Sequence, residues 1–340
     1  ETYKCKGFRA ILHAGHINRT LNIAALLYVD DTDLLHKPVQ PQTTEAEIVR
    51  YTQQATHYWA KLLQATGGNL KATKCYWYLL SYKFVKGIAT LKTLGDLHHH
   101  TLTIPQLEGD DRAVKLKDNF RASKVLGIWS SPSSTDNQHL QYMITKGQEW
   151  TRRIRSSTLD TQEIWQSFSS QAIPSVKYGL MTLMTYQQDL DYHFQAWYYQ
   201  CLPILGINRS ISKFWRALPV EFQGLGLPNM TLEKLASSLT FLRQHWANNT
   251  AVGKALRGTY ELCQLEIGLE DNFLEKNYNR YSILASHTWF KVLWELLDYY
   301  KVSLTLMDTK ITPPRERDYP LMERVITTLP RQHWTAFNRV

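Results

Sequence analysis

The sequence predicts an α+β chain in which strands and helices mix over residues 1–130, whereas helices dominate the regions 131–250 and 251–340. In the first region, short apolar runs bounded by turn residues are typical of strands. Beyond it, apolar residues recur every three or four positions, which is the period of an amphipathic helix. The 340 residues are 44% hydrophobic and 20% charged, so the chain is long enough for two cores, and fibrous or wholly disordered classes are excluded.

An acidic turn between two strands is predicted near the start of the chain. Residues 23–29 are all apolar or aromatic and lead into Asp30 and Asp31, after which Leu34 and Leu35 resume the apolar pattern. This pattern predicts two short strands with the carboxylates at the turn between them.

A helix and further strands are expected after this turn. Thr44 and Glu47 have the spacing of a capping box, and apolar residues then recur at helical spacing up to Gly67. Residues 76–91 predict a pair of strands because they are rich in aromatic residues and valine, and residues 98–111 predict a loop or a strand connection. Residues 125–129 predict one short strand, and we place the domain boundary at the Ser/Pro-rich stretch 130–135.

The second half is predicted to be helical nearly throughout. The aromatic cluster at residues 197–199 could stack on nucleic-acid bases, but aromatic residues at helical spacing pack more often in a core, and we expect a core here. The helical prediction rests on three helix-period stripes, that is, sets of mostly apolar residues spaced three or four apart. They are Leu140, Met143, Gly147, Trp150 and Ile154; Leu232, Leu235, Leu239, Leu242 and Trp246; and Trp289, Val292, Leu293, Leu296 and Tyr299.

Positive charge is concentrated in one segment. The chain carries a net charge of +9, and residues 112–155 contain nine Lys and Arg against three Asp and Glu. Such a segment can neutralise phosphates of a nucleic acid and release their counterions. A solvated helix face that keeps the chain soluble is the alternative interpretation.

The sequence predicts neither a membrane-spanning helix nor a framework of disulfide bonds. The apolar run 23–29 is much shorter than the roughly 20 residues that a bilayer requires, so we expect no membrane partner. The four cysteines are scattered without a Cys-x-x-Cys pair, which favours a reducing intracellular setting. His98, His99 and His100 could bind a metal, but no partner stands at ligand spacing, so we expect a solvated loop.

Asp30 and Asp31 are the residues that point most directly to chemistry. Two adjacent carboxylates after an apolar strand are favourable when a cation accompanies them. Mg²⁺ takes carboxylate oxygens and substrate phosphates, and two such ions about 3.5–4 Å apart promote phosphoryl transfer. A merely polar turn is one alternative. A phosphotransferase that uses Asp31 and Asp33 is a weaker one, because the sequence lacks its other motifs.

The sequence Tyr28-Val29-Asp30-Asp31 resembles the YxDD motif of reverse transcriptases, and the resemblance continues in order over roughly residues 20–245. The glycine-led turn at 67–68, followed by Lys74, is similar to the family's next palm motif. The stretch around Leu126 and Gly127 resembles a strand whose hairpin helps to hold the primer end in enzymes of non-LTR retrotransposons. Residues 176–180 and 218–228 resemble the helical region after the palm.

The resemblance implies an RNA-directed DNA polymerase that extends a primer on an RNA or DNA template with dNTPs. Such an enzyme would be expected in the cytoplasm or nucleus. Residues 1–130 would be a partial palm with the YxDD hairpin, residues 131–250 a helical thumb-like region and residues 251–340 a helical C-terminal region. Asp30 and Asp31 would be catalytic and would hold two Mg²⁺ ions, and Tyr28 and Lys74 would lie at the incoming nucleotide. Leu126, Gly127, Lys146, Arg152 and Arg153 would contact the primer and template.

The family's remaining metal ligand is an aspartate on an earlier strand, and we expect it upstream of Glu1. The chain is therefore predicted to be a C-terminal fragment that is inactive when isolated. A non-catalytic, nucleic-acid-binding remnant of a retroelement is the alternative. Both hypotheses predict binding, and they differ on catalysis.

Overall fold

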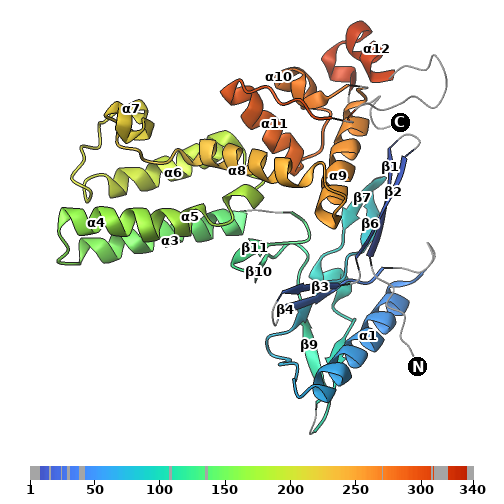
Figure 1. Ribbon diagram of the computed structural model, residues 1–340. Helices are drawn as coiled ribbons and strands as arrows, with labels where there is room; N and C mark the ends of the chain where they lie inside the picture. Colours follow the sequence, from blue (N-terminus) through green and yellow to red (C-terminus); the bar gives the residue numbers. More distant parts are fainter. Residues whose placement is uncertain are drawn as a thin grey trace. The chain divides into compact units, whose positions relative to one another are not determined.

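The structure is a computed structural model that describes residues 8–14, 17–23, 25–28, 31–37, 43–106, 109–134, 137–269, 271–307, 309 and 321–334. It is a mixed α+β chain with two compact units (Figure 1). The first comprises Glu1–Ile11, Thr20–Ser123 and Ser130–Thr135, and the second Leu12–Arg19, Lys124–Trp129 and Asp136–Val340. Within the described residues, none of the helices combines the length and apolarity needed to span a bilayer.

The β-structure consists of small sheets. Four of them are two-stranded: β1 (Phe8–Ala14) with β2 (Ile17–Ile23), β3 (Ala25–Tyr28) with β4 (Asp31–Leu34), β6 (Tyr82–Val85) with β7 (Ile88–Leu91), and β10 (Ser123–Val125) with β11 (Ile128–Ser130). A three-stranded sheet has the order β5 (Tyr76–Trp77), β9 (Arg112–Leu116) and β8 (Leu102–Ile104). In it, β5 runs parallel and β8 antiparallel to β9.

Two helices accompany these strands, α1 (Glu45–Ala65) and the single turn α2 (Leu94–Leu97). Helix α1 packs on β8 through buried Ala60. The side-chain amide of Gln53 exchanges two hydrogen bonds of 2.8 Å with the backbone of Thr103. Because β8 is an edge strand of its sheet, this amide satisfies backbone groups that would otherwise stay open.

The second unit is helical. Its elements are α3 (Asn137–Arg155), α4 (Thr161–Ser167), a π-helical turn (Phe168–Ala172), α5 (Ile173–Lys177), α6 (Gln187–Cys201), α7 (Lys213–Ala217), α8 (Met230–His245), α9 (Ala251–Ile267), α10 (Tyr278–Tyr281), α11 (Trp289–Tyr300) and α12 (Leu321–Thr328). Single 3₁₀ turns lie at Leu180–Thr182, Val220–Phe222, Phe273–Glu275 and Arg331–His333.

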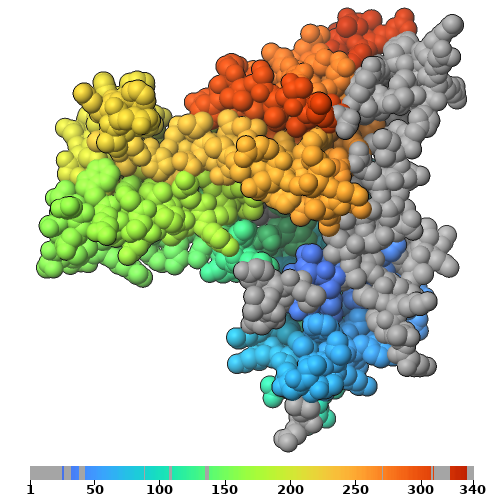
Figure 2. Space-filling view, in the orientation of Figure 1, coloured from blue at the N-terminus to red at the C-terminus, as the bar shows by residue number. Residues whose placement is uncertain are grey.

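Two cores hold this unit together. The first joins α3, α5 and α6 around fully buried Trp197, and the second joins α8, α9 and α11 around Trp294. Helices α6 and α8 pack on each other, and Figure 2 shows the green segment of α3–α5 directly against the yellow and orange segment that follows it. Helix α3 is therefore fixed on one side by a close-packed core and presents its other side to solvent.

Several predicted elements are confirmed. The antiparallel β3–β4 pair is the predicted strand–turn–strand unit, and α1 begins with the predicted capping box at Thr44 and Glu47. The three helix-period stripes lie in α3, in α8 with Trp246 just after its end, and in α11, although Leu232 and Tyr299 are exposed. Trp197 and Tyr198 are buried as expected of a core, whereas Tyr199 is exposed, against that expectation.

Two predicted elements are wrong in detail. Residues 98–111, expected as a loop or connection, contain strand β8, whose Leu102 and Ile104 are buried under α1. Residues 125–129, expected as one strand, form a hairpin, because Leu126 and Gly127 both have positive φ and reverse the chain. A leucine in that conformation is uncommon, so an apolar run containing it is easily taken for a continuous strand.

Candidate nucleic-acid interface

The hairpin β3–β4 contains the acidic motif. Its register pairs Tyr28 with Asp31, and residues 29 and 30, which stand between them in the sequence, lie outside the described residues. Of Tyr28 and Asp31, the structure describes only the backbone. The assignment of Asp30 and Asp31 as metal ligands stays a prediction.

Lys74 lies in the turn that follows α1. Its backbone N–H donates to the carbonyl of Lys71 at 2.8 Å, and its side chain is exposed. No hydrogen bond or ion pair fixes this ammonium group within the described parts of the chain. No contact of Lys74 among the described residues tests its role at an incoming nucleotide, so that role stays a prediction.

The hairpin β10–β11 turns at Leu126 and Gly127, with φ of 49° and 85°. Positive φ at both central residues is the geometry of a tight two-residue turn, which glycine adopts without strain. The Tyr178 hydroxyl donates to the Leu126 carbonyl at 2.5 Å, and a Cβ at Gly127 would lie 2.9 Å from the Tyr178 ring. The turn thus rests against an aromatic ring that leaves space for glycine alone, while the Leu126 side chain is exposed.

Two further contacts fasten this hairpin to α3. The Trp129 backbone N–H donates to Nδ1 of His139 at 3.3 Å, and the Lys124 ammonium donates to the Tyr142 hydroxyl at 3.1 Å. His139 is buried, and its burial lowers the pKa of the imidazole. Nδ1 of His139 can accept this hydrogen bond from Trp129 only when the imidazole is neutral. The neutral form is also the one that burial favours.

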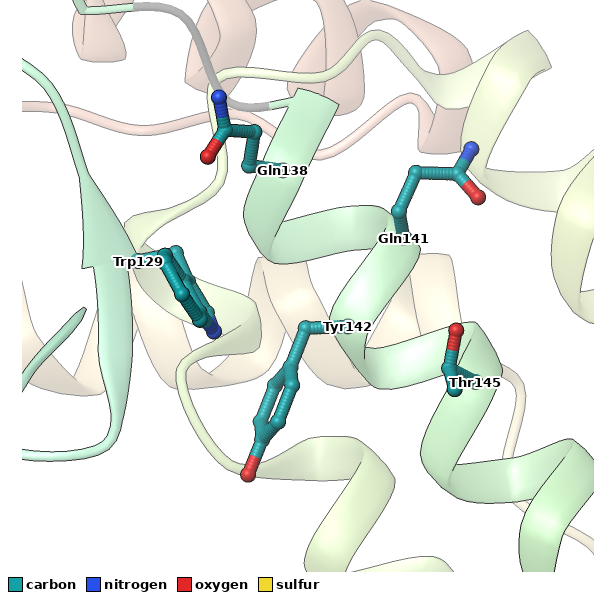
Figure 3. A pocket seen from close by; sticks show the side chains of 5 residues that line it. All are labelled: Trp129, Gln138, Gln141, Tyr142 and Thr145. Carbon is teal, nitrogen blue, oxygen red and sulfur yellow. The ribbon is translucent and has the colours of Figure 1, made fainter. Parts of the chain in front are cut away.

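The solvent-facing side of α3 is polar and aromatic. At 100° per residue, residues 138, 141, 142, 145, 146, 149, 152 and 153 share one side of the helix, opposite the buried stripe that begins at Leu140. Near the start of the helix, this side and the hairpin enclose an open pocket of about 330 Å³. Its lining residues are Trp129 from β11 and Gln138, Gln141, Tyr142 and Thr145 from successive turns of α3 (Figure 3).

Cations surround the pocket and continue along the helix. The ammonium groups of Lys124 and Lys146 lie 4.7 Å and 5.5 Å from the centroid of the Tyr142 ring. Lys146 also lies 3.6 Å from Glu149. Exposed Arg152 and Arg153 follow in the last turn, where positive charge is favoured by the helix dipole.

The structure thus brings some of the predicted contact residues together. Lys146, Arg152 and Arg153 share one side of α3, and Leu126 and Gly127 lie in the hairpin that Lys124 and Trp129 fasten to that helix. The residues that line the pocket were not predicted from the sequence. A signal was present, since the polar positions opposite the apolar stripe include Gln138, Gln141 and Tyr142. Their contact with β11 is a tertiary feature that no sequence spacing reveals.

A second polar cluster lies in the first unit. Glu45, His99 and His100 place one ligand atom each within 4.8 Å of the others. The Glu45 carboxylate already accepts hydrogen bonds from Lys92, Ser81 and His100. Burial would raise the pKa of Glu45, but these hydrogen bonds outweigh it and lower the pKa to about 2. The expected solvated loop is therefore wrong at His100, which ties this loop to the start of α1.

Comparison of the chain with protein-family models, curated proteins and solved structures finds no match.

Proposed function

We propose that this chain binds a primer–template nucleic acid through the hairpin β10–β11 and the polar side of α3. The observation that carries the proposal is the composition of that one helix side. The Tyr142 ring and two amides near its start, with Trp129 of β11 beside them, are followed by Lys146, Arg152 and Arg153, while the opposite side of α3 is fixed in a core. A rigid helix holds the backbone of these residues in register, so that only their side chains are ordered on binding.

The spacing of these groups suits a phosphate backbone. Tyr142 and Arg152 are ten residues apart, or about 15 Å along a helix, which spans about four nucleotides of a strand at 3.4 Å each. Each ammonium or guanidinium group that meets a phosphate releases a condensed counterion, so the affinity depends on salt. A solvated face with no ligand, the alternative interpretation, explains the charges but not the aromatic rings beside them.

We further propose that the parent polypeptide is a polymerase of the reverse-transcriptase class. The β3–β4 hairpin supports this proposal, because its register pairs Tyr28 with Asp31, the first residue of β4, and Asp30 directly precedes Asp31 in the sequence. Two carboxylates at such a hairpin fit Mg²⁺, a hard cation that prefers oxygen ligands. Asp30 and Asp31 would hold the metal, which supplies charge stabilisation in phosphoryl transfer, and Tyr28 and Lys74 would orient the dNTP.

Primer extension by the full-length polypeptide that carries this sequence tests the catalytic proposal. We expect Asp30→Asn to reduce the extension rate at least 100-fold while the affinity for primer–template changes less than two-fold, because the carboxylate acts on the reaction rather than on binding. Glu221→Gln, which removes an exposed carboxylate of the helical unit, is the control and should extend normally. Extension that persists in Asp30→Asn would exclude the metal-ligand assignment. Binding without extension in the unsubstituted protein would favour the non-catalytic remnant.

A further inference from the structure

We propose that the open pocket between β11 and α3 receives one unpaired nucleobase of a bound nucleic acid. This inference rests on the proposed binding function and deepens it. The cations of α3 account for contacts with phosphates, and the pocket adds a site that contacts a base. The pocket comprises Trp129, Gln138, Gln141, Tyr142 and Thr145.

The two aromatic rings provide surfaces for stacking. The centroids of Trp129 and Tyr142 are 6.4 Å apart and their planes are tilted by 56°, so the rings do not stack on each other. Figure 3 shows Trp129 on the strand and Tyr142 on the helix, with open space between the strand and the polar residues of α3. Aromatic faces of this kind bind unstacked bases with little sequence preference.

Hydrogen-bonding groups lie beside the rings. Gln138 and Gln141 are exposed, and each amide offers both donors and an acceptor, which can match the edge of an unpaired base. Trp129 contributes its ring rather than its indole N–H, which has almost no solvent contact.

The charges indicate where the phosphate of that nucleotide would lie. Lys124 and Lys146 both approach the Tyr142 ring, so their ammonium groups are no more than about 10 Å apart. An anion between them would interact favourably with both, since each cation repels the other. A volume of about 330 Å³ is near the lower end for small-ligand pockets, which suits one nucleotide rather than a base pair.

A neutral apolar peptide could pack against the two rings, but it would bring no negative charge to the two ammonium groups and would not use the hydrogen-bonding groups of the two exposed amides. An unpaired nucleotide engages all three kinds of group. The observations therefore favour a nucleobase over a peptide as the occupant, and RNA and DNA share the chemistry required.

Matched oligonucleotides test the proposal with the full chain. One labelled duplex carries a four-nucleotide single-stranded extension, and its partner has the same extension with abasic sites, so that both have the same number of phosphates. We expect the protein to bind the base-containing duplex about ten-fold more tightly, because stacking requires the bases. RNA and DNA versions of the extension show whether the preference depends on the 2′-hydroxyl.

Variants assign this preference to the pocket. Tyr142→Leu and the double variant Gln138→Ala/Gln141→Ala should bring the ratio of the two affinities close to one, while affinity for the abasic duplex changes less than three-fold. Gln148→Ala, exposed on the same helix but outside the pocket, is the control and should keep the ten-fold ratio. The Gln variants change only exposed side chains, so loss of folding would not obscure the result.

Three results would overturn the inference. Equal affinity for both duplexes in the unsubstituted protein would exclude a base pocket and leave phosphate binding intact. A ten-fold ratio that survives both pocket variants would place base recognition elsewhere. Failure to bind either duplex at low salt would contradict the proposed binding function itself.

Discussion

Gly127 is the residue on which the shape of hairpin β10–β11 depends most directly. Its φ is 85°, and an added Cβ would lie 2.9 Å from the Tyr178 ring. We expect Gly127→Ala to lower the free energy of unfolding by about 2–4 kcal/mol, from backbone strain and overpacking together. Gly87→Ala is the matched control, because Gly87 has a φ of 79° but no atom within 4 Å of an added Cβ. It should lose only about 1 kcal/mol in urea denaturation. Equal losses would show that Tyr178 does not restrict the turn.

Glu45 makes the stability of the first unit sensitive to acid. Hydrogen bonds from Lys92, Ser81 and His100, opposed by burial, lower its pKa from the usual 4.5 to about 2. A carboxyl whose pKa is lowered on folding stabilises the native state above its unfolded pKa, so this contribution is lost as the pH falls from about 4.5 to 2.

We expect Glu45→Gln to lower the free energy of unfolding at pH 7 by roughly 1–2 kcal/mol, because the Glu45 and Lys92 side chains are only 23% and 24% exposed. The variant should also show a smaller decrease between pH 4.5 and 2. Urea denaturation across that range measures both effects. A pH profile parallel to that of the unsubstituted protein would mean that the ion pair contributes nothing.

At the scale of elements, α3 is the helix on which the proposed binding surface depends. Gly147 sets how closely α3 approaches α6. An added Cβ would lie 2.7 Å from the Trp197 ring. Alanine favours helix by about 1 kcal/mol over glycine, but overpacking costs about 1–3 kcal/mol, so we expect Gly147→Ala to destabilise the protein by up to about 2 kcal/mol. The neighbouring exposed Gln148→Ala should change stability by less than 0.5 kcal/mol. A rise in melting temperature for Gly147→Ala would contradict this packing.

The elements that sequence predicts well are those that local chemistry defines. Thr44 and Glu47 mark the start of α1 because the two ends of a capping box are three residues apart. The stripe of α3 is equally readable, since its spacing directly sets which side is buried. Strand β8 was not predicted because its buried residues, Leu102 and Ile104, are covered by α1, which is distant in the sequence.

The candidate site was predictable only in part, for a related reason. The charges of Lys146, Arg152 and Arg153 are evident in the sequence, and so is the acidic motif at Asp30 and Asp31. The turn at Leu126 was not evident, because the Tyr178 hydroxyl that supports its backbone lies 52 residues away. The contact between Trp129 and Tyr142 could not be predicted either, because the turn at Leu126 is what brings Trp129 to α3.

At the scale of the whole molecule, the net charge of +9 is unevenly placed, and residues 112–155 carry +6 of it. A basic chain attracts nucleic acid at long range, but only cations close to the ligand release counterions. If the nucleic acid binds through α3, removing charges from α3 should weaken binding more than removing the same number of charges elsewhere. If it binds through the overall charge, both changes should weaken binding equally.

The dependence of affinity on salt tests the binding surface most directly. The measurement is fluorescence anisotropy of a labelled primer–template at several salt concentrations, with log K plotted against log[salt]. The variant Lys146→Gln/Arg152→Gln/Arg153→Gln is compared with Arg209→Gln/Lys213→Gln/Arg243→Gln, which removes the same charge from exposed positions elsewhere in the helical unit. We expect the first variant to reduce the magnitude of the slope by about 2–3, close to one per lost phosphate contact, and the second to leave it unchanged. Equal slopes in the two variants would contradict the assignment of α3 as the nucleic-acid interface.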